Sequence, residues 1–270
     1  TIGTPFILLV DGQYMNDLYY NSVEIIQAIP MSNIKKIEMV YGPSSSLYGA
    51  NALMGVLNII TKSPTDKDAS SNFTISSKSD DHIPGNLQKI IDFSYKTTDL
   101  PVNYSVTGRG HFGKENSSHY DEYEYTNPSY SYDSDTWGGA LQNENLYGHK
   151  SPIRNLSLDT RIYFKDFEMG MFYYTMNNGY GIEYAFNSIQ PNAVWAERER
   201  NIFLKHQTNM ESKFFKNFNI TNLFRLRSSD VLGSSYEIYN YNGYVGFDYF
   251  QALNDSISFQ TTSDFSVSDN

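Results

Sequence analysis

The residues best suited to metal chemistry lie in one segment, residues 111–152. The segment combines imidazole and carboxylate groups, which can ligate a transition metal or hold a haem iron. Its candidate ligands are His111, His119, Tyr120, Asp121, Glu122, Glu124, Tyr125 and His149. Their spacing matches no closed metal site, so the simpler interpretation is a solvated acidic loop with incidental histidines. We keep His111, His119 and Tyr120 as candidate ligand contacts and predict no bound metal and no cofactor.

A catalytic site is not indicated by the segment Gly42-Pro-Ser-Ser-Ser-Leu-Tyr-Gly49. It lacks the Gly-x-Ser-x-Gly turn that exposes a nucleophilic serine. It also lacks the Gly-Lys-Ser/Thr ending of a phosphate-binding loop. The chain has no cysteine, which excludes disulfides and thiolate metal sites. We therefore predict that the protein is not an enzyme.

The charge of the chain excludes another class of partner. A formal net charge of −10 argues against nucleic-acid binding, which needs cations to neutralise phosphates. Much of the acidity lies in residues 115–135, which indicates an exposed acidic loop. Arg198 and Arg200 alternate with Glu197 and Glu199 where a loop meets a strand. They indicate a solvated rim, or a place where an anionic ligand is steered.

The elements that would position these residues are strands with alternating apolar and polar side chains. Nine such segments follow Pro64, at residues 72–76, 91–95, 102–107, 158–165, 167–176, 202–210, 218–226, 241–250 and 256–265. Together with 23 Tyr and 17 Phe, this pattern is typical of a membrane barrel with aromatic rims. On this pattern Met169 and Met171 would face lipid rather than a metal.

The connections between these segments are predicted to alternate in length. Short turns are expected near residues 97–101, 165–166, 211–216 and 253–255. Longer loops are expected at residues 79–85, 111–152, 177–199 and 228–240, on the extracellular side. Nine strands cannot close an even-stranded barrel, and lipid does not tolerate open sheet edges. Because plugged transporters have about 22 strands, we expect the remaining strands to lie outside these residues.

The N-terminal quarter carries a series of motifs in a fixed order. Eight features follow one another: Phe6 to Val10, Asp11-Gly12, Asn16-Asp17, Ile29-Pro30, Ile37-Glu38, Gly42-Pro43, Leu47-Tyr48-Gly49 and Gly55-Val-Leu-Asn-Ile-Ile-Thr61. In this order and spacing they resemble the C-terminal half of the plug domain of TonB-dependent outer-membrane receptors. The turn glycines also make sense physically, since glycine adopts positive φ without a steric penalty.

The resemblance implies an all-β membrane barrel with about 22 antiparallel strands in the full protein, about nine of them here. A small α/β plug would sit in its lumen, with residues 1–64 as the C-terminal half of the plug and 65–270 as the first part of the barrel. Two departures stand out. Tyr41 replaces the usual arginine, so the ionic contact of the plug with the barrel wall is in doubt. The chain also begins inside the plug, without a TonB box, as a fragment would.

The resemblance also implies sites, partners and a function. The plug apex would offer Asp17, Tyr19, Tyr20 and Asn21 as ligand contacts, although these rings could instead pack the plug against the wall. Structural motif positions would be Asp11, Gly12, Gly42, Pro43, Tyr48 and Gly49. The implied function is uptake of an iron–siderophore, haem, cobalamin or similar ligand across a Gram-negative outer membrane, surrounded by its lipid and energised by TonB with ExbB and ExbD. The alternative is a non-transporting outer-membrane component that binds protein partners.

Overall fold

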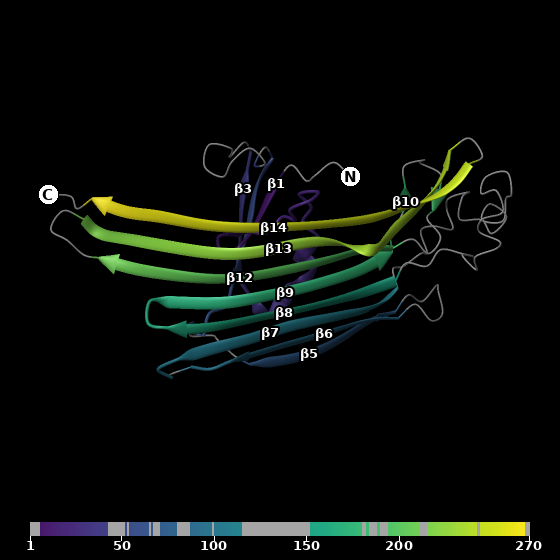
Figure 1. Cartoon of the computed structure of the whole chain (residues 1–270). Helices are drawn as coiled ribbons and strands as arrows, with labels where there is room; N and C mark the ends of the chain where they lie inside the picture. Colours follow the sequence, from purple (N-terminus) through teal and green to yellow (C-terminus); the bar gives the residue numbers. More distant parts are fainter. Residues whose placement is uncertain are drawn as a thin grey trace.

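The computed structural model describes residues 6–42, 52, 54–64, 66, 71–79, 87–98, 100–114, 152–179, 182–183, 188–189, 194–210, 215–241 and 244–267. They form a four-stranded sheet, an eight-stranded sheet and the short pair β10 (Ile182–Glu183) and β11 (Ser188–Ile189). Figure 1 shows the small sheet lying against one face of the large one. Within the described ranges, no helix has the length and apolar character needed to cross a membrane.

The small sheet and its helical turns form the N-terminal unit, residues 6–64. Its strands are β1 (Phe6–Val10), β2 (Gln13–Tyr14), β3 (Ile34–Tyr41) and β4 (Gly55–Thr61), in the order β2-β1-β4-β3. The β1–β4 pair is parallel and the other pairs are antiparallel. Two 3-10 helices, η1 (Glu24–Ala28) and η2 (Met31–Asn33), lead into β3. Asp11 and Gly12, with φ of 50° and 78°, make the tight turn between β1 and β2.

The large sheet, called the wall below, is an antiparallel series of eight strands. They are β5 (Asn72–Ser79), β6 (Leu87–Lys96), β7 (Asn103–Lys114), β8 (Pro152–Phe164), β9 (Phe167–Gly179), β12 (Val194–Met210), β13 (Phe215–Tyr241) and β14 (Tyr244–Val267). Each strand pairs with the next of these along the chain, so β5 and β14 are the two edges and the wall is not closed within the described residues. This arrangement confirms the predicted antiparallel barrel strands beside a small plug-like unit.

The two faces of the wall differ as the alternating pattern predicted. On β12, Asn201 and Phe203 are 2% and 3% exposed, whereas Ile202 and Leu204 between and beyond them are 50% and 43% exposed. Ile202 and Leu204 pair with Met171 and Met169 of β9, which lie on the same exposed face. The N-terminal unit covers the inner face, and the outer face is apolar. This polarity is that of strands with lipid outside and water or protein inside.

The core joins the N-terminal unit to the wall. Buried Leu8, Met15, Ile25 and Ile59 pack in one cluster with Tyr174 and Met176 of β9. The N-terminal unit therefore has its apolar side against the wall, and the two share a hydrophobic centre.

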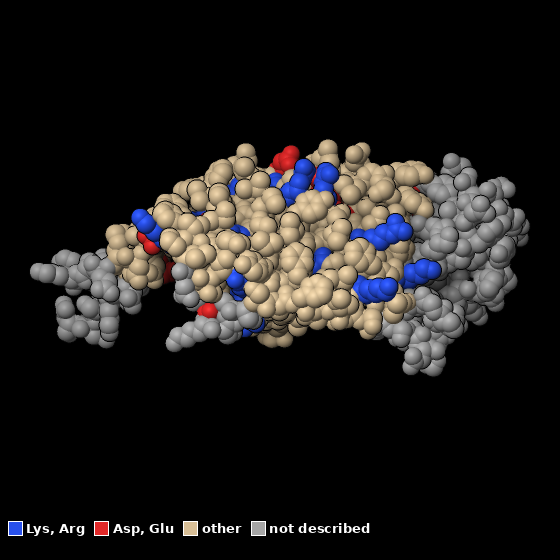
Figure 2. Space-filling view, turned by 90° about the horizontal axis from the view of Figure 1, so that it is seen from below, with Lys and Arg blue, Asp and Glu red and all other residues tan. Residues whose placement is uncertain are grey.

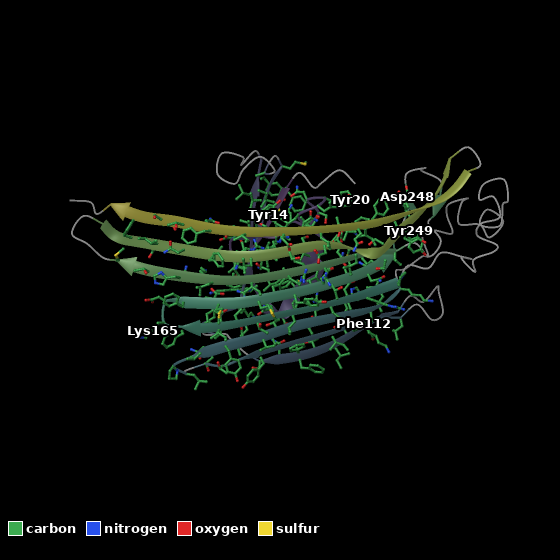
Figure 3. All side chains as sticks on the ribbon, in the orientation of Figure 1. Tyr14, Tyr20, Phe112, Lys165, Asp248 and Tyr249 are labelled. Atoms are coloured by element: carbon green, nitrogen blue, oxygen red, sulfur yellow. The ribbon has the colours of Figure 1, made fainter. Side chains whose placement is uncertain are left out.

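The two ends of the wall carry connections of different length. At one end, Lys165 and Asp166 alone join β8 to β9. At the other end, residues 115–151 join β7 to β8 and residues 180–193 join β9 to β12. Figure 3 shows Lys165 at the first end, called the turn end, and Phe112, Asp248 and Tyr249 toward the second, called the loop end.

The C-terminal part of the wall differs from the prediction. The described wall has eight strands rather than about nine, because the segments predicted at residues 241–250 and 256–265 are not separate strands: residues 244–250 and 256–265 belong to the single strand β14. The turn predicted at residues 253–255 and the loop predicted at 228–240 were wrong, since both segments lie within paired strands. Backbone pairing between β13 and β14 continues through the polar residues of both segments. The pairing is interrupted by a register shift between Val231 and Ser235.

Candidate functional site

The predicted apex loop is organised by Asp17. Its carboxylate accepts hydrogen bonds from the backbone N–H groups of Tyr19 at 2.8 Å, Tyr20 at 2.7 Å and Ser22. Asn21 has a φ of 57°, and its side-chain oxygen accepts a hydrogen bond from the Tyr14 hydroxyl at 2.5 Å. Asp17 and Asn21 therefore shape the loop, and the tyrosines between them are the side chains it presents.

The two predicted tyrosines have different surroundings. Their rings meet edge to face with centroids 4.3 Å apart, and Tyr19 is 48% exposed. The Tyr20 ring lies 5.5 Å from Trp195, which in turn lies 5.5 Å from Phe250 of β14. A row of aromatic rings thus runs from the apex onto the wall, and Figure 3 shows Tyr20 nearer the loop end than Tyr14. Tyr20 packs against the wall, while Tyr19 is accessible.

Sequence reasoning missed Trp195 as a member of this aromatic row. The indole N–H donates to Glu197 Oε1 at 2.6 Å, which fixes the ring orientation. The available signal was a tryptophan at the start of a strand, where amphipathic rings gather at the rims of membrane barrels. The tyrosines were found because a motif located their loop, but no motif located their partner on the wall.

The predicted loop ligands are only partly described. His111 lies on β7, where its Nε2 is 3.2 Å from the side-chain oxygen of Gln88 on the neighbouring strand. His119 and Tyr120 lie outside the described residues, as do Pro43, Tyr48 and Gly49 of the structural motif. No group of three potential metal-ligating side chains occurs in the part of the chain that the structure describes. His111 is thus placed on the wall, away from the apex tyrosines along the sheet.

Two buried wall arginines hold the N-terminal unit near its β2 strand. Arg225 donates to the backbone oxygen of Tyr14 at 2.5 Å and to Asn201 at 2.7 Å. Arg227 donates to the backbone oxygen of Met15 at 3.1 Å and forms an ion pair with Glu199. Asn201 also donates to the Gln13 side chain at 3.2 Å. The two arginine contacts reach the backbone of the unit from the wall, so they depend on where the unit lies on the wall.

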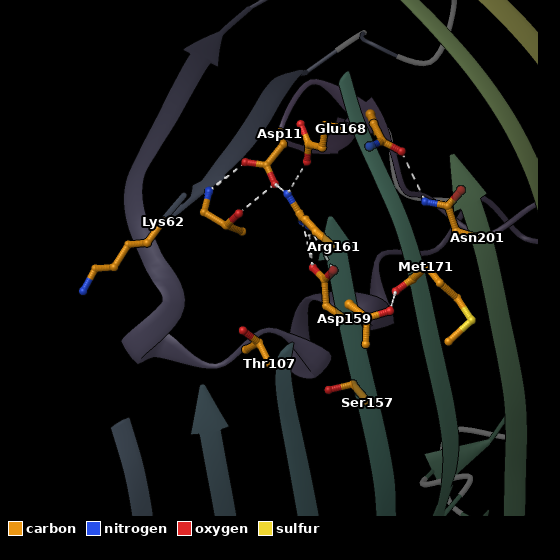
Figure 4. A network of polar contacts seen from close by, with 12 residues as sticks. Asp11, Lys62, Thr107, Ser157, Asp159, Arg161, Glu168, Met171 and Asn201 are labelled. Atoms are coloured by element: carbon orange, nitrogen blue, oxygen red, sulfur yellow. Dashed lines mark hydrogen bonds and ion pairs between the residues drawn. The ribbon is translucent and has the colours of Figure 1, made fainter. Parts of the chain in front are cut away.

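A third buried arginine joins the unit to the wall at the turn end. Arg161 on β8, whose side chain is 9% exposed, contacts Asp11 and Asp159 at 2.7 Å and Glu168 at 3.3 Å. Asp11 also accepts hydrogen bonds from the backbone N–H and the hydroxyl of Thr61, each at 2.8 Å. Figure 4 shows Asp11 reaching from the N-terminal unit toward Arg161. The Asp11–Arg161 pair, called the latch below, links elements 150 residues apart.

The latch replaces an ionic contact that the sequence put in doubt. Tyr41, which stands at the expected arginine position, is 84% exposed and carries no charge. The link between the unit and the wall is made instead by a carboxylate on the unit and a guanidinium on the wall. The charges are thus the reverse of the expected arrangement, in which the arginine would lie on the plug. Asp11, predicted only as a turn residue, therefore has a second role.

The latch should weaken in acid. Burial raises the pKa of Asp11, but Arg161 and the hydrogen bonds from Thr61 outweigh it, so the pKa falls below the ordinary value of 3.8. A lowered pKa means that the ionised form stabilises the folded state, fully above pH 3.8, and that this contribution is lost as the pH falls through the lower folded value. We expect protease susceptibility of residues 6–64 to rise below pH 3.8. Asp11→Asn should abolish this pH dependence, and an unchanged profile in that variant would contradict the assignment.

Comparison with known proteins agrees with this geometry. Residues 4–56 match the family model described as TonB-dependent Receptor Plug Domain. The ferric enterobactin receptor PfeA of Pseudomonas aeruginosa is 16% identical with a TM-score of 0.64, covering 96% of this chain and 38% of that one. The siderophore receptor PirA of Acinetobacter baumannii is 12% identical with a TM-score of 0.57, covering 98% and 38%. PiuA of the same organism is 11% identical with a TM-score of 0.54, covering 96% and 34%.

These identities show a shared fold, and the chain spans little more than a third of the length of the receptors it matches. The fold and the family model nevertheless point to one class. The model matches the unit that holds Asp11 and the apex tyrosines, and the receptors share the fold across both the unit and the wall. Residues 4–56 therefore match a TonB-dependent receptor plug domain, and the chain shares the fold of the matched receptors, with a plug-like unit lying against an open part of a β-barrel wall.

Proposed function

We propose that the chain is part of a TonB-dependent transporter in the outer membrane of a Gram-negative bacterium, which takes up an iron–siderophore or a similar metal chelate. In this proposal residues 1–64 are the C-terminal half of the plug and residues 65–270 the first part of the barrel. The long connections at the loop end would face outside the cell. The observation that carries the proposal is a plug segment held by polar contacts on the inner face of a wall whose outer face is apolar.

The contacts between plug and wall suit a plug that can be displaced. Alongside the shared apolar cluster, several of the connections are hydrogen bonds and an ion pair from Arg161, Arg225 and Arg227. Each hydrogen bond contributes a net ~1 kcal/mol, because water can replace either partner. Pulling the plug into a wet lumen would therefore exchange these contacts for water. TonB, driven by ExbB and ExbD, would supply the pull.

The apex supports a ligand with flat aromatic groups. Tyr19 is exposed beside a row of rings, and tyrosine combines a broad apolar face with a hydroxyl that can donate or accept. Such a surface fits an aromatic iron chelate bound between the plug apex and the outer loops. The PfeA receptor, which shares the fold, has been solved in complex with enterobactin.

Uptake of radioactive iron carried by an aromatic siderophore tests this function in cells that express the complete receptor. We expect uptake that disappears in a strain without TonB, and Tyr19→Ala should weaken ligand binding roughly tenfold through loss of ring contact. Tyr95→Ala is the matched control, since Tyr95 is similarly exposed, at 51%, but lies on β6 of the wall rather than on the apex loop. Uptake that persists without TonB would contradict transport by this route. Binding without any uptake would instead support the partner-binding alternative.

A further inference from the structure

A pair of arginines on β12 points away from the plug. Glu199 and Asn201 face inward, where they contact Arg227 and Gln13. Because side chains alternate along a strand, Arg198 and Arg200 lie on the outer face of the wall. Their side chains are 33% and 50% exposed. The rim predicted from the sequence at this point is therefore an outward-facing site rather than part of the lumen.

The two arginines share one carboxylate. Arg198 donates to Asp230 Oδ2 from Nη2 at 2.7 Å and from Nε at 3.1 Å, and Arg200 donates to the same oxygen from Nη2 at 2.9 Å. Asp230, on the neighbouring strand, is only 1% exposed under them. Two cations and one anion leave a net charge of +1. Among the described residues, Nη1 of both arginines and Nε of Arg200 make no hydrogen bond, so donors are left for a further anion.

The site lies at one border of an apolar band. Directly beyond Arg200 on the outer face come Ile202 and Leu204, both exposed. Farther along the same face of β12 come His206 and Thr208, so Ile202 and Leu204 are the apolar residues beside the site on this strand. Tyr173, paired with Arg200 across the strands, adds an amphipathic ring at the same level.

We propose that Arg198 and Arg200 bind the phosphate of a lipid head group at the loop-end surface of the membrane. The inference rests on the proposed membrane location and goes beyond ligand transport. Guanidinium groups suit phosphate because their planar N–H donors match its oxygens. Ile202 and Leu204 directly below would contact the acyl chains of the same lipid, which a soluble phosphate does not have. Asp255, opposite Ser228 on β14, lies on this face as well, one strand farther from Arg200 than Ser228.

The geometry predicts opposite effects for two sets of substitutions. The triple variant R198Q/R200Q/D230N removes the three charges but keeps hydrogen-bonding side chains, so no buried carboxylate is left unpaired. It should bind a phosphomonoester lipid roughly tenfold more weakly, and D230N alone, which raises the net charge by one, should bind it roughly fivefold more tightly. The matched control is Lys165→Gln, which removes a wall cation at the turn end.

The complete receptor is placed in phosphatidylcholine vesicles with a minor fraction of phosphatidic acid, and bound phosphatidic acid is counted by native mass spectrometry after extraction. Equal binding by the triple variant and the wild type would overturn the site, as would D230N binding no more tightly. Competition by inorganic phosphate as effective as by the lipid would overturn a lipid as the ligand. A wild-type receptor that does not insert into vesicles would refute the membrane location. Insertion with unchanged lipid binding would refute this site alone.

Discussion

Replacing Arg161 with methionine should detach the turn end of the plug from the wall and lower the free energy of unfolding by about 3–5 kcal/mol. Its guanidinium is almost fully buried and is shared by Asp11, Asp159 and Glu168. Methionine fills a similar volume but leaves these carboxylates close together without a cation. Removing one partner of a buried ionic network is far more damaging than replacing the whole network with apolar groups.

Denaturant unfolding of the complete receptor, together with protease digestion of residues 6–64, measures this effect. Lys35→Ala is a suitable control, because it breaks an ion pair with Asp66 in which the Lys35 side chain is 48% exposed. Exposed pairs contribute about 0–1 kcal/mol. Asp11→Asn should be milder than Arg161→Met, since Arg161 keeps Asp159 as a partner. A loss below about 1 kcal/mol for Arg161→Met would contradict the latch.

Gly55→Ala should disrupt the plug sheet by about 3 kcal/mol or more. Gly55 begins β4 with a φ of 141°, a conformation that side chains rarely adopt. An added Cβ would lie 2.2 Å from the backbone oxygen of Val40 on the paired strand β3. The oxygen belongs to the backbone, so it cannot move without breaking the β3–β4 pairing that Tyr41 and Gly55 begin.

The same unfolding and digestion measurements test Gly55→Ala against a second glycine. At Gly233 on β13, an added Cβ would come no closer than 3.6 Å, to the flexible side chain of Gln251. Gly233→Ala should therefore leave stability nearly unchanged. Similar small effects for both substitutions would show that β3 and β4 do not pair as described.

The plug could be predicted because its signals are local. The Asp11-Gly12 turn, between an apolar strand and a polar segment, depends on neighbouring residues, and a fixed order of such local motifs identifies the unit. The two-faced wall was predictable for a similar reason, since alternation along β12 is visible without knowing its partners. What these signals cannot give is the register between strands, which decides which side chains meet.

The C-terminal hairpin shows how a local signal was misread. The turn expected at residues 253–255 lies within β14, where these residues pair with β13. A stronger hairpin signal, Asn242-Gly243, stands between Tyr241 and Tyr244, which pair with each other. A turn placed between Tyr241 and Tyr244 reduces the expected strands from nine to eight.

The site residues also divide into those that local motifs predict and those whose contacts depend on the fold. Tyr19 and Tyr20 were found through the motif that precedes them, whereas Trp195 comes from a strand about 175 residues away. Asp11 was predicted as a turn residue, and its contact with Arg161 required the fold. The placement of Arg198 and Arg200 on the outer face also required the fold, because the sequence shows a charged rim but not which face of the wall the rim occupies.

A disulfide between Leu18→Cys and Ser229→Cys tests most directly the claim that the plug lies on the inner face of the wall and must move during transport. The Leu18 N–H donates to the Ser229 hydroxyl at 3.3 Å, and the 270 residues contain no competing cysteine. The account predicts that the bond forms in the complete receptor, stops siderophore uptake, and that a reductant restores uptake. A bond that forms while uptake continues at the full rate, or cysteines that never meet under oxidising conditions, would contradict it.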